Sequence, residues 1–330
     1  MTLQRTDVFG IMRADLERVN ERVAQVAQVD FPEASALVHD IVSAGGKRLR
    51  PLVLLLAGRA FDYRAQFDRL VTAAAGVELL HTASLIHDDT VDRSALRRGK
   101  PTLNSVLSAG ATILIGDYLF AQSAMLAATT GNVRVVAIFA STLGDICNGQ
   151  LREMFQAHRL DQTREEYDAR IYGKTASLFA GSAEMGAVLG NASEEQIQAL
   201  RGFGADIGMA FQVVDDVLDI TGQIADLGKP VGNDLREGTI TLPTLLYASE
   251  LPQGSNEWRQ LERVASGHAN GDGELEAVVA SVRSSHAIEQ TYAAAETFID
   301  RAKARLTDLP DPETRELLWE VADVALSRLS

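Results

Sequence analysis

Two stretches of this chain place the same pattern of aspartates on an apolar helical background. Residues 80–92 read LHTASLIHDDTVD and residues 211–219 read FQVVDDVLD, so DDxxD begins at Asp88 and again at Asp215, 127 positions later. On a helix, the first and last aspartates of each pattern lie four residues apart and face the same way. Carboxylates that close repel each other, and a bound cation removes the repulsion. The pattern therefore predicts two cation-binding helices.

The residues around the first pattern suggest which cation and which ligand. Mg²⁺ is usually held by one or two carboxylates together with substrate phosphates and waters. Arg97, Arg98 and Lys100 follow the first pattern and suit phosphate oxygens. A single DDxxD is explained equally well by a solvated acidic helix end before a basic loop. The repeat favours two helices that face each other across a cavity and hold a diphosphate between Mg²⁺ ions.

Two further basic segments contain glycine. GGKRLRP at 45–51 places Lys47 and Arg50 in a turn before a helix, where backbone N–H groups and cations can meet an anion. YGKTASLF at 172–179 places Gly173, Lys174 and Thr175 inside a helical pattern. Glycine there costs about 1 kcal/mol relative to alanine, which suggests a kink or a close approach to a ligand. A solvated loop and a surface lysine are the alternatives.

The periodicity along the rest of the chain is helical. Apolar residues recur at helical spacing over 7–28, Pro32 opens the next helix, and Thr163 with Glu166 forms a capping box. No segment shows sustained alternation of apolar and polar residues, and no βαβ unit is visible. We expect an all-α fold, a bundle of about a dozen helices. Residues 1–330 are expected to form a single domain.

Composition excludes several classes of function. The formal net charge is −14 and the pI about 4.9, which argues against nucleic acid or an anionic lipid surface as a partner. Cys147 is the single cysteine, so no intrachain disulfide can form, and we expect it in the core. Residues 110–128 are apolar but contain Asp117 and Gln122, which predicts a buried helix rather than a membrane span. We expect a cytoplasmic protein without a membrane anchor.

Taken together, the motifs resemble those of one family. Both DDxxD patterns, GGKRLRP, RRGKPT at 97–102, GKTASLF at 173–179 and GKPVGNDLREGT at 228–239 occur in the order typical of the trans-prenyl diphosphate synthases, or polyprenyl synthetases. The resemblance covers roughly residues 40–245 and implies the isoprenoid synthase type of fold, in which the helices surround a central apolar cavity. It implies a Mg²⁺-dependent prenyltransferase that condenses isopentenyl diphosphate with an allylic diphosphate. It also implies a homodimer, and a lipid-soluble product that would involve transient membrane contact.

The resemblance assigns roles to individual residues. Asp88, Asp92 and Asp215 match the metal ligands and, with Lys174, the catalytic residues, while Asp216 and Asp219 match supporting ligands. The positions that match isopentenyl diphosphate binding are Lys47, Arg50, His81 and Arg98. The positions that match allylic diphosphate binding are Arg97, Lys174, Thr175, Gln212 and Lys229.

The length of the product is predicted from the positions just before the first DDxxD. In family members that make short products, an aromatic residue here blocks the tunnel that receives the growing chain, whereas Ala83 and Ser84 are small. We expect a medium-to-long all-trans product, for example a quinone side-chain precursor. Two alternatives stay open: a class I terpene cyclase, which the second DDxxD disfavours, and a non-catalytic partner subunit, which the complete motifs disfavour.

Overall fold

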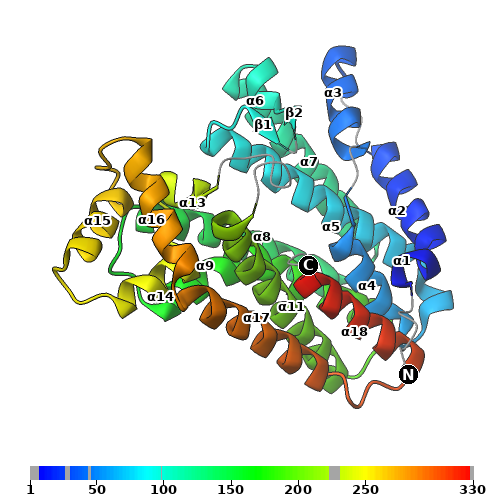
Figure 1. Cartoon of the computed structure of the whole chain (residues 1–330). Helices are drawn as coiled ribbons and strands as arrows, with labels where there is room; N and C mark the ends of the chain where they lie inside the picture. Colours follow the sequence, from blue (N-terminus) through cyan, green and yellow to red (C-terminus); the bar gives the residue numbers. More distant parts are fainter. Residues whose placement is uncertain (1–6, 27–29, 44–45, 98, 223–230, 328–330) are drawn as a thin grey trace. The chain divides into compact units, whose positions relative to one another are not determined.

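The computed structural model is almost entirely α-helical, and the described residues are 7–26, 30–43, 46–97, 99–222 and 231–327 (Figure 1). The helices up to the middle of the chain are α1 (Val8–Ile11), α2 (Arg13–Val26), α3 (Pro32–Ser43), α4 (Leu49–Arg59), α5 (Tyr63–Val91), α6 (Leu103–Val106), α7 (Ala109–Thr129), α8 (Val133–Gln156) and α9 (Arg164–Ile171). They are followed by a π-helix, η1 (Tyr172–Ala176), and by α10 (Ser177–Leu189), α11 (Glu194–Thr221), α13 (Asn233–Arg236), α14 (Leu242–Glu250), α15 (Asn256–Ala265), α16 (Asp272–Ser284), α17 (Ala287–Ala304) and α18 (Pro312–Leu326).

The expected all-α class is confirmed. The described strands are β1 (Leu96–Arg97) and β2 (Lys100–Pro101), an antiparallel pair that joins Leu96 to Pro101 and Arg97 to Lys100. The chain divides into two compact units. Unit 1 comprises Met1–Gly144, Leu178–Gly204 and Lys303–Ala322, and unit 2 comprises Asp145–Ser177, Ala205–Ala302 and Asp323–Ser330. The single domain expected over residues 1–330 stays a prediction.

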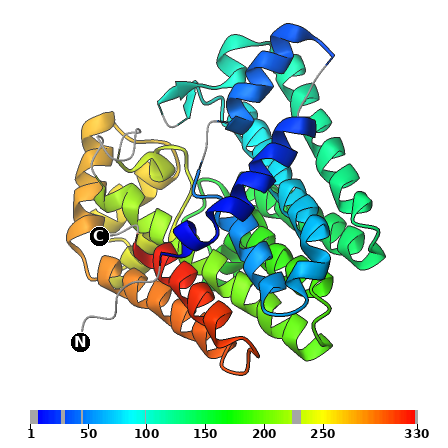
Figure 2. The same cartoon turned by 90° about the vertical axis from the view of Figure 1, so that its right-hand side faces the viewer.

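Helix α5 is the centre of unit 1. Every residue from Leu70 to Leu80 is buried, because α2, α3, α4 and α7 all pack against this helix (Figures 1 and 2). A helix that is apolar on all sides is stable only inside a core. Gly116 of α7 lies directly against the His87 ring, since a Cβ there would be 2.2 Å from Nε2. The packing therefore fixes the end of α5 that carries the first aspartates.

Helix α7 differs from the prediction of a buried helix over residues 110–128. Two described helices, α5 and α7, are long and apolar enough to cross a membrane, but core helices of soluble proteins meet the same criterion. The apolar window of α5 is 78% buried and that of α7 only 39%. Residues 110–128 are thus buried along one face, while Leu114 and Met125 on the other are 68% and 61% exposed.

Cys147 also differs from the prediction. It is exposed rather than in the core, because it lies on the outward face of α8 with Leu151. Because that exposed face of α8 also carries apolar residues, the sequence of α8 resembles that of a helix in the core.

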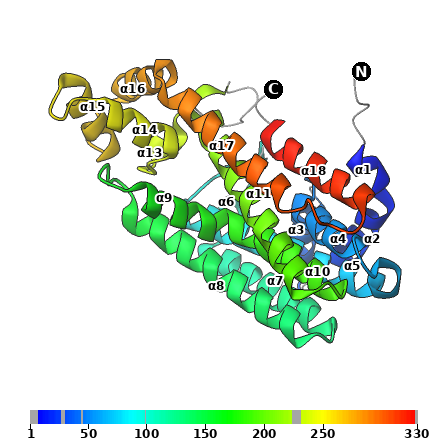
Figure 3. The same cartoon turned by 90° about the horizontal axis from the view of Figure 1, so that it is seen from below.

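Unit 2 has its own core. The helices α13 to α16 pack on one another and on the end of α11 (Figure 3), around Ile220, Leu235, Tyr247, Leu261 and Val278. The predicted capping box is present, with the Thr163 side chain accepting from Glu166 N and the Glu166 side chain accepting from Thr163 N. It starts α9, which leads into η1.

Candidate functional site

The first DDxxD lies at the C-terminal end of α5, as predicted. The amide of Asp92 donates to the carbonyl of Asp88 at 2.8 Å, so these two aspartates are one helical turn apart. Asp88 is half-buried and Asp92 is exposed. Their carboxylates are hard oxygen ligands at the boundary between core and solvent, which suits a cation that keeps several waters.

Asp89 has a different role from its two neighbours in the motif. It is buried, and Nε of Arg97 donates to both of its carboxylate oxygens, at 2.8 and 3.0 Å. Arg97 lies on β1 of the hairpin, so this ion pair joins the hairpin to the end of α5. Arg98 belongs to the predicted site but lies outside the described residues.

The basic turn at 46–50 is attached to α5 through two residues on one helix face. Arg48 has a left-handed backbone conformation, with φ 47°, and its guanidinium forms an ion pair with Glu78 and donates to the carbonyl of Val42 at 2.7 Å. Nη1 of Arg50 lies 3.2 Å from Nε2 of His81, and its guanidinium carbon lies 4.5 Å from the Phe179 ring centroid. The structure thus brings Arg50 and His81 together, as predicted, while Lys47 beside them is exposed.

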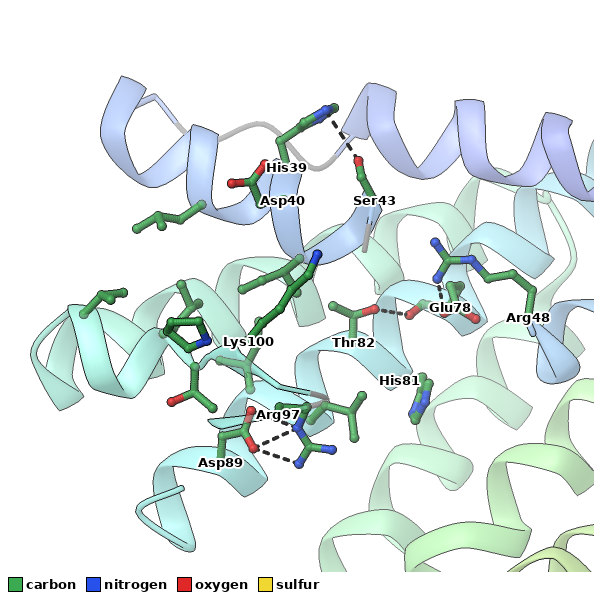
Figure 4. Close-up of a pocket in the computed structure, with 18 residues that line it drawn as sticks. His39, Asp40, Ser43, Arg48, Glu78, His81, Thr82, Asp89, Arg97 and Lys100 are labelled. Carbon is green, nitrogen blue, oxygen red and sulfur yellow. Dashed lines mark hydrogen bonds and ion pairs between the residues drawn. The ribbon is translucent and has the colours of Figure 1, made fainter. Parts of the chain in front are cut away.

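A cavity of about 760 Å³ opens beside this face of α5 in unit 1 (Figure 4). Glu78, His81, Thr82 and Asp89 line it from α5. Figure 4 shows Lys100 reaching from the hairpin towards α3, and Arg97 turned back onto Asp89. Its apolar lining comes from Leu37, Ile41, Leu85, Ile86, Pro101, Leu103 and Val106. The combination of cations and apolar wall suits a ligand with an anionic head and an apolar body.

The second DDxxD lies on the part of α11 that belongs to unit 2. Asp215 is half-buried, whereas Asp216 and Asp219 are almost fully buried. Both oxygens of Asp216 accept hydrogen bonds, Oδ2 from the Tyr167 hydroxyl at 2.7 Å and Oδ1 from Nε2 of Gln212 at 2.9 Å. Burial, and then the charge of Asp234, raise the pKa of Asp216 to about 7 despite these hydrogen bonds. The Asp216 carboxyl group therefore faces other side chains of unit 2 rather than solvent.

Asp219 contacts the start of α13. Its Oδ2 accepts from the amide of Asp234 at 3.2 Å, and its carbonyl accepts from the amide of Gly232 at 2.8 Å. Lys229, which is predicted to bind the allylic diphosphate, lies outside the described residues.

The unusual glycine at 173 is explained by the backbone. Residues 172–176 form the π-helix η1, and such turns are frequent at functional sites. A Cβ at Gly173 would lie 2.8 Å from the carbonyl of Asp145, and one at Gly149 would lie 2.1 Å from the amide of Lys174. These glycines let η1 touch α8. The contact brings Lys174 into an ion pair with Glu153 of α8.

Thr175 completes the polar group in unit 2. Its hydroxyl donates to Oε1 of Gln212 at 2.7 Å, so the two predicted allylic-site residues are in contact. Sequence reasoning missed the partners that hold these side chains: Asp89 for Arg97, Glu153 for Lys174, Tyr167 for Asp216, and Glu78 for Arg48, which lies between the predicted Lys47 and Arg50. Asp89 lay within the motif itself, and Glu78 lies one turn before His81 on α5. Glu153 and Tyr167 carry no signal in the sequence, since only the fold brings them to their partners.

The donor sets fit a divalent cation that also uses ligand oxygens. Among the residues the structure describes, no group of three or more His, Cys, Asp or Glu side chains is arranged to hold a metal ion without other ligands. Asp88 and Asp92 in unit 1, and Asp215 in unit 2, instead offer one or two carboxylates at each motif. That number suits Mg²⁺ bound together with phosphate oxygens.

Comparison with known proteins identifies the family. The polyprenyl synthetase family matches residues 32–282. Heptaprenyl diphosphate synthase component 2 of Geobacillus stearothermophilus is 38% identical over 96% of each chain. Octaprenyl diphosphate synthase of Escherichia coli (strain K12) is 36% identical over 99% of this chain and 97% of its own.

A solved structure agrees with these relatives. The polyprenyl synthase from Caulobacter crescentus CB15, complexed with calcium and isoprenyl diphosphate, superposes with a TM-score of 0.91 at 35% identity, over 99% of this chain and 100% of that one. The chain therefore belongs to the polyprenyl synthetase family, and within it to the medium- and long-chain trans-prenyl diphosphate synthases. It is a prenyltransferase that acts on isoprenyl diphosphates.

Proposed function

We propose that this enzyme condenses isopentenyl diphosphate with an allylic diphosphate in a Mg²⁺-dependent reaction and repeats the step to a medium-to-long all-trans product. The observation that carries the proposal is that each aspartate motif is linked by hydrogen bonds or an ion pair to predicted diphosphate-binding side chains in the same unit. Arg97 forms an ion pair with Asp89 of the first motif. Arg50 of α4 contacts His81, which lies on α5, the helix that carries this motif. Thr175 and Gln212 join the second motif through Asp216.

The chemistry follows from these groups. When bound, Mg²⁺ would neutralise the charge that develops on the leaving diphosphate. We propose that Asp88 and Asp92 in unit 1 bind Mg²⁺, and that Asp215 in unit 2 does so with Asp216 and Asp219 in support. In unit 2, Lys174, Thr175 and Gln212 would bind the allylic diphosphate and stabilise it as the C–O bond breaks, a role that the motifs also predict for Arg97. Lys47, Arg50 and His81 would orient isopentenyl diphosphate so that its double bond attacks the allylic carbon. Apolar walls keep water from the carbocation.

A product assay tests the proposal. Purified chain, Mg²⁺, labelled isopentenyl diphosphate and farnesyl diphosphate are incubated, and the dephosphorylated lipids are sized. We expect a ladder that ends at a long polyprenol and that disappears with EDTA. A hydrocarbon formed without isopentenyl diphosphate would indicate a cyclase. Elongation that starts only after a second protein is added would indicate a two-component enzyme, an arrangement that the name of the Geobacillus relative brings to attention.

We also propose that the enzyme is a homodimer that uses the exposed face of α7. Ile113, Leu114 and Met125 are exposed there, next to small exposed residues such as Ala121 and Ala124. Large exposed apolar patches are unusual on monomers, and small residues allow two helices to approach closely. Helix α7 contains no Lys or Arg, which an interfacial membrane helix usually carries. A second copy is therefore better supported than lipid.

The location follows from composition and remains part of the proposal. A net charge of −14 and a single, exposed cysteine suit a cytoplasmic enzyme. We propose that its lipid product, for example a quinone side-chain precursor, leaves by transient contact with a membrane. Partition of the product, but not of the enzyme, into added vesicles would support this.

A further inference from the structure

A chain of buried and part-buried hydrogen bonds in unit 2 ends on Asp216. The Thr175 hydroxyl donates to Oε1 of Gln212 at 2.7 Å, and Nε2 of Gln212 donates to Oδ1 of Asp216 at 2.9 Å. From the other side, the Tyr167 hydroxyl donates to Oδ2 of Asp216 at 2.7 Å. Every donor points towards the carboxylate, so the orientation of each group depends on the next one.

Tyr167 is the fixed end of this chain. It is fully buried, and the guanidinium carbon of Arg170 lies 5.5 Å from its ring centroid. Arg170 is itself held, since its Nη1 donates to Oε1 of Gln162 at 2.9 Å and its Nη2 donates to the carbonyl of Ile240 at 2.6 Å. The phenol ring therefore has little freedom to move, and its hydroxyl defines where the Asp216 carboxylate can lie.

We propose that Tyr167 is a positioning residue for the reaction. Its hydroxyl fixes Asp216, and through Gln212 it fixes the Thr175 hydroxyl, so that the second aspartate motif and η1 are held ready for the allylic diphosphate and its cation. The proposal rests on the proposed function. It adds a residue that is outside the aspartate motifs and the basic segments.

The geometry explains why one hydroxyl has this influence. Without it, the buried Oδ2 of Asp216 loses its donor, and a buried acceptor without a partner is unfavourable. The carboxylate would then turn towards other donors, and Nε2 of Gln212 would follow or lose its bond. Thr175 would lose its acceptor in turn. Because Asp215 is the neighbouring residue on α11, its orientation depends on the same helix segment.

The chain offers a closely matched control. The Tyr63 hydroxyl also donates to a carboxylate, Oδ2 of Asp15, at 2.7 Å, but in unit 1 and between residues that have no predicted site role. Tyr63→Phe and Tyr167→Phe remove the same kind of hydrogen bond and leave the ring. Both variants are assayed where circular dichroism shows them to be folded, after the wild type has been shown to elongate with Mg²⁺. That first result tests the proposed function separately.

For Tyr167→Phe, we expect the KM for the allylic diphosphate and the half-saturating Mg²⁺ concentration to rise about tenfold, which is the scale of one lost hydrogen bond to a charged group. The KM for isopentenyl diphosphate should stay within about twofold. Calorimetry with Mg²⁺ and an allylic thiodiphosphate, an analogue whose C–S bond resists cleavage, should show the same loss of affinity without any turnover. Tyr63→Phe should lower the melting temperature only.

Three results would overturn the proposal. One is unchanged Mg²⁺ and allylic dependence in a folded Tyr167→Phe enzyme. Another is loss of helical structure in Tyr167→Phe at the assay temperature, which would make the hydroxyl structural. The third comes from a double-variant cycle: if Tyr167→Phe weakens allylic binding as much in an Asp216→Asn background as in the wild type, the hydroxyl does not act through Asp216.

Discussion

The guanidinium of Arg97 forms a forked ion pair with Asp89, with Nε at 2.8 and 3.0 Å from the two carboxylate oxygens. The middle aspartate of the first DDxxD is thus engaged by the protein, while Asp88 and Asp92 lie on an adjacent face of the same helix. A charged fork of this kind fixes orientation as well as charge. The three aspartates of this motif should therefore respond differently to substitution.

Asp88→Asn and Asp89→Asn test this difference. Loss of a proposed metal ligand should reduce kcat by about 10²-fold or more, the scale seen when one electrostatic group is removed from a catalytic site. Asp89→Asn should instead raise the KM for the allylic diphosphate several-fold and change kcat little, because Arg97 is still present but less well oriented. Steady-state kinetics with each substrate varied in turn separates the two. Equal losses of kcat in both variants would contradict distinct roles.

The Arg48–Glu78 ion pair should matter for the other substrate. Glu78→Gln keeps the shape but removes the charge that faces Arg48 in a buried setting, where a lost charged hydrogen bond costs about 1–3 kcal/mol. The turn that carries Lys47 and Arg50 should loosen, and the KM for isopentenyl diphosphate should rise. Glu313→Gln removes the exposed pair with Arg59 and serves as the control. Equal KM values for isopentenyl diphosphate in Glu78→Gln and Glu313→Gln would show that Glu78 does not contribute to binding of this substrate.

Product length should respond to residue size just before the first motif. Ala83 is fully buried, so Ala83→Phe should both shorten the product and destabilise the fold by about 1–3 kcal/mol through overpacking. Ser84 is half-buried, and its hydroxyl donates to the carbonyl of His81 at 2.8 Å. Ser84→Phe should shorten the product with less loss of stability. Ser84→Ala is the size control, and a product ladder unchanged by both phenylalanines would refute the tunnel prediction.

The sequence predicts the helices well because their signals are local. The helix opened by Pro32 and the Thr163 capping box each depend on residues within a few positions. The sequence also singles out cations and carboxylates through their spacing in the motifs, and their roles in binding stay predictions. Contacts such as Lys174 with Glu153 could not be predicted, because they depend on how two helices pack.

Exposure is the other property that the sequence does not reveal. The apolar pattern of a helix does not depend on whether its apolar faces are buried within its own chain. The predictions that α7 is a buried helix and that Cys147 lies in the core are therefore wrong. Burial depends on tertiary packing rather than on local pattern. The two errors concern exposed faces with the composition of an interior.

Leu114→Lys tests whether that face joins two copies. A charge placed at the centre of an apolar interface is strongly unfavourable, so the mass measured by light scattering should fall from that of a dimer to that of a monomer. Ile11→Lys introduces the same change at another exposed apolar residue and should leave the mass unchanged. A wild-type enzyme that is already monomeric would contradict the proposed homodimer.

The Arg134–Glu194 pair predicts a pH dependence of stability. Hydrogen bonds from Arg134, and then from Gln198, lower the pKa of Glu194 from 4.5 to about 2. A lowered pKa in the folded state gives a contribution that is present above pH 4.5 and is lost as the pH falls towards 2. Arg134→Gln should therefore lower the melting temperature slightly at pH 7, with a difference that shrinks below pH 4.5. A constant difference at every pH would contradict this origin.

The π-helix at Tyr172–Ala176 makes the chain intolerant of length changes at this point. Such a turn contains one residue more than an α-helix would, so deleting one residue would let the regular ladder of hydrogen bonds continue. The backbone would become locally more regular, yet each α-helical residue advances the side chains by about 100°. Tyr167 would rotate out of step with Thr175 and away from Asp216. Among aligned relatives, this segment should therefore accept substitutions far more readily than insertions or deletions.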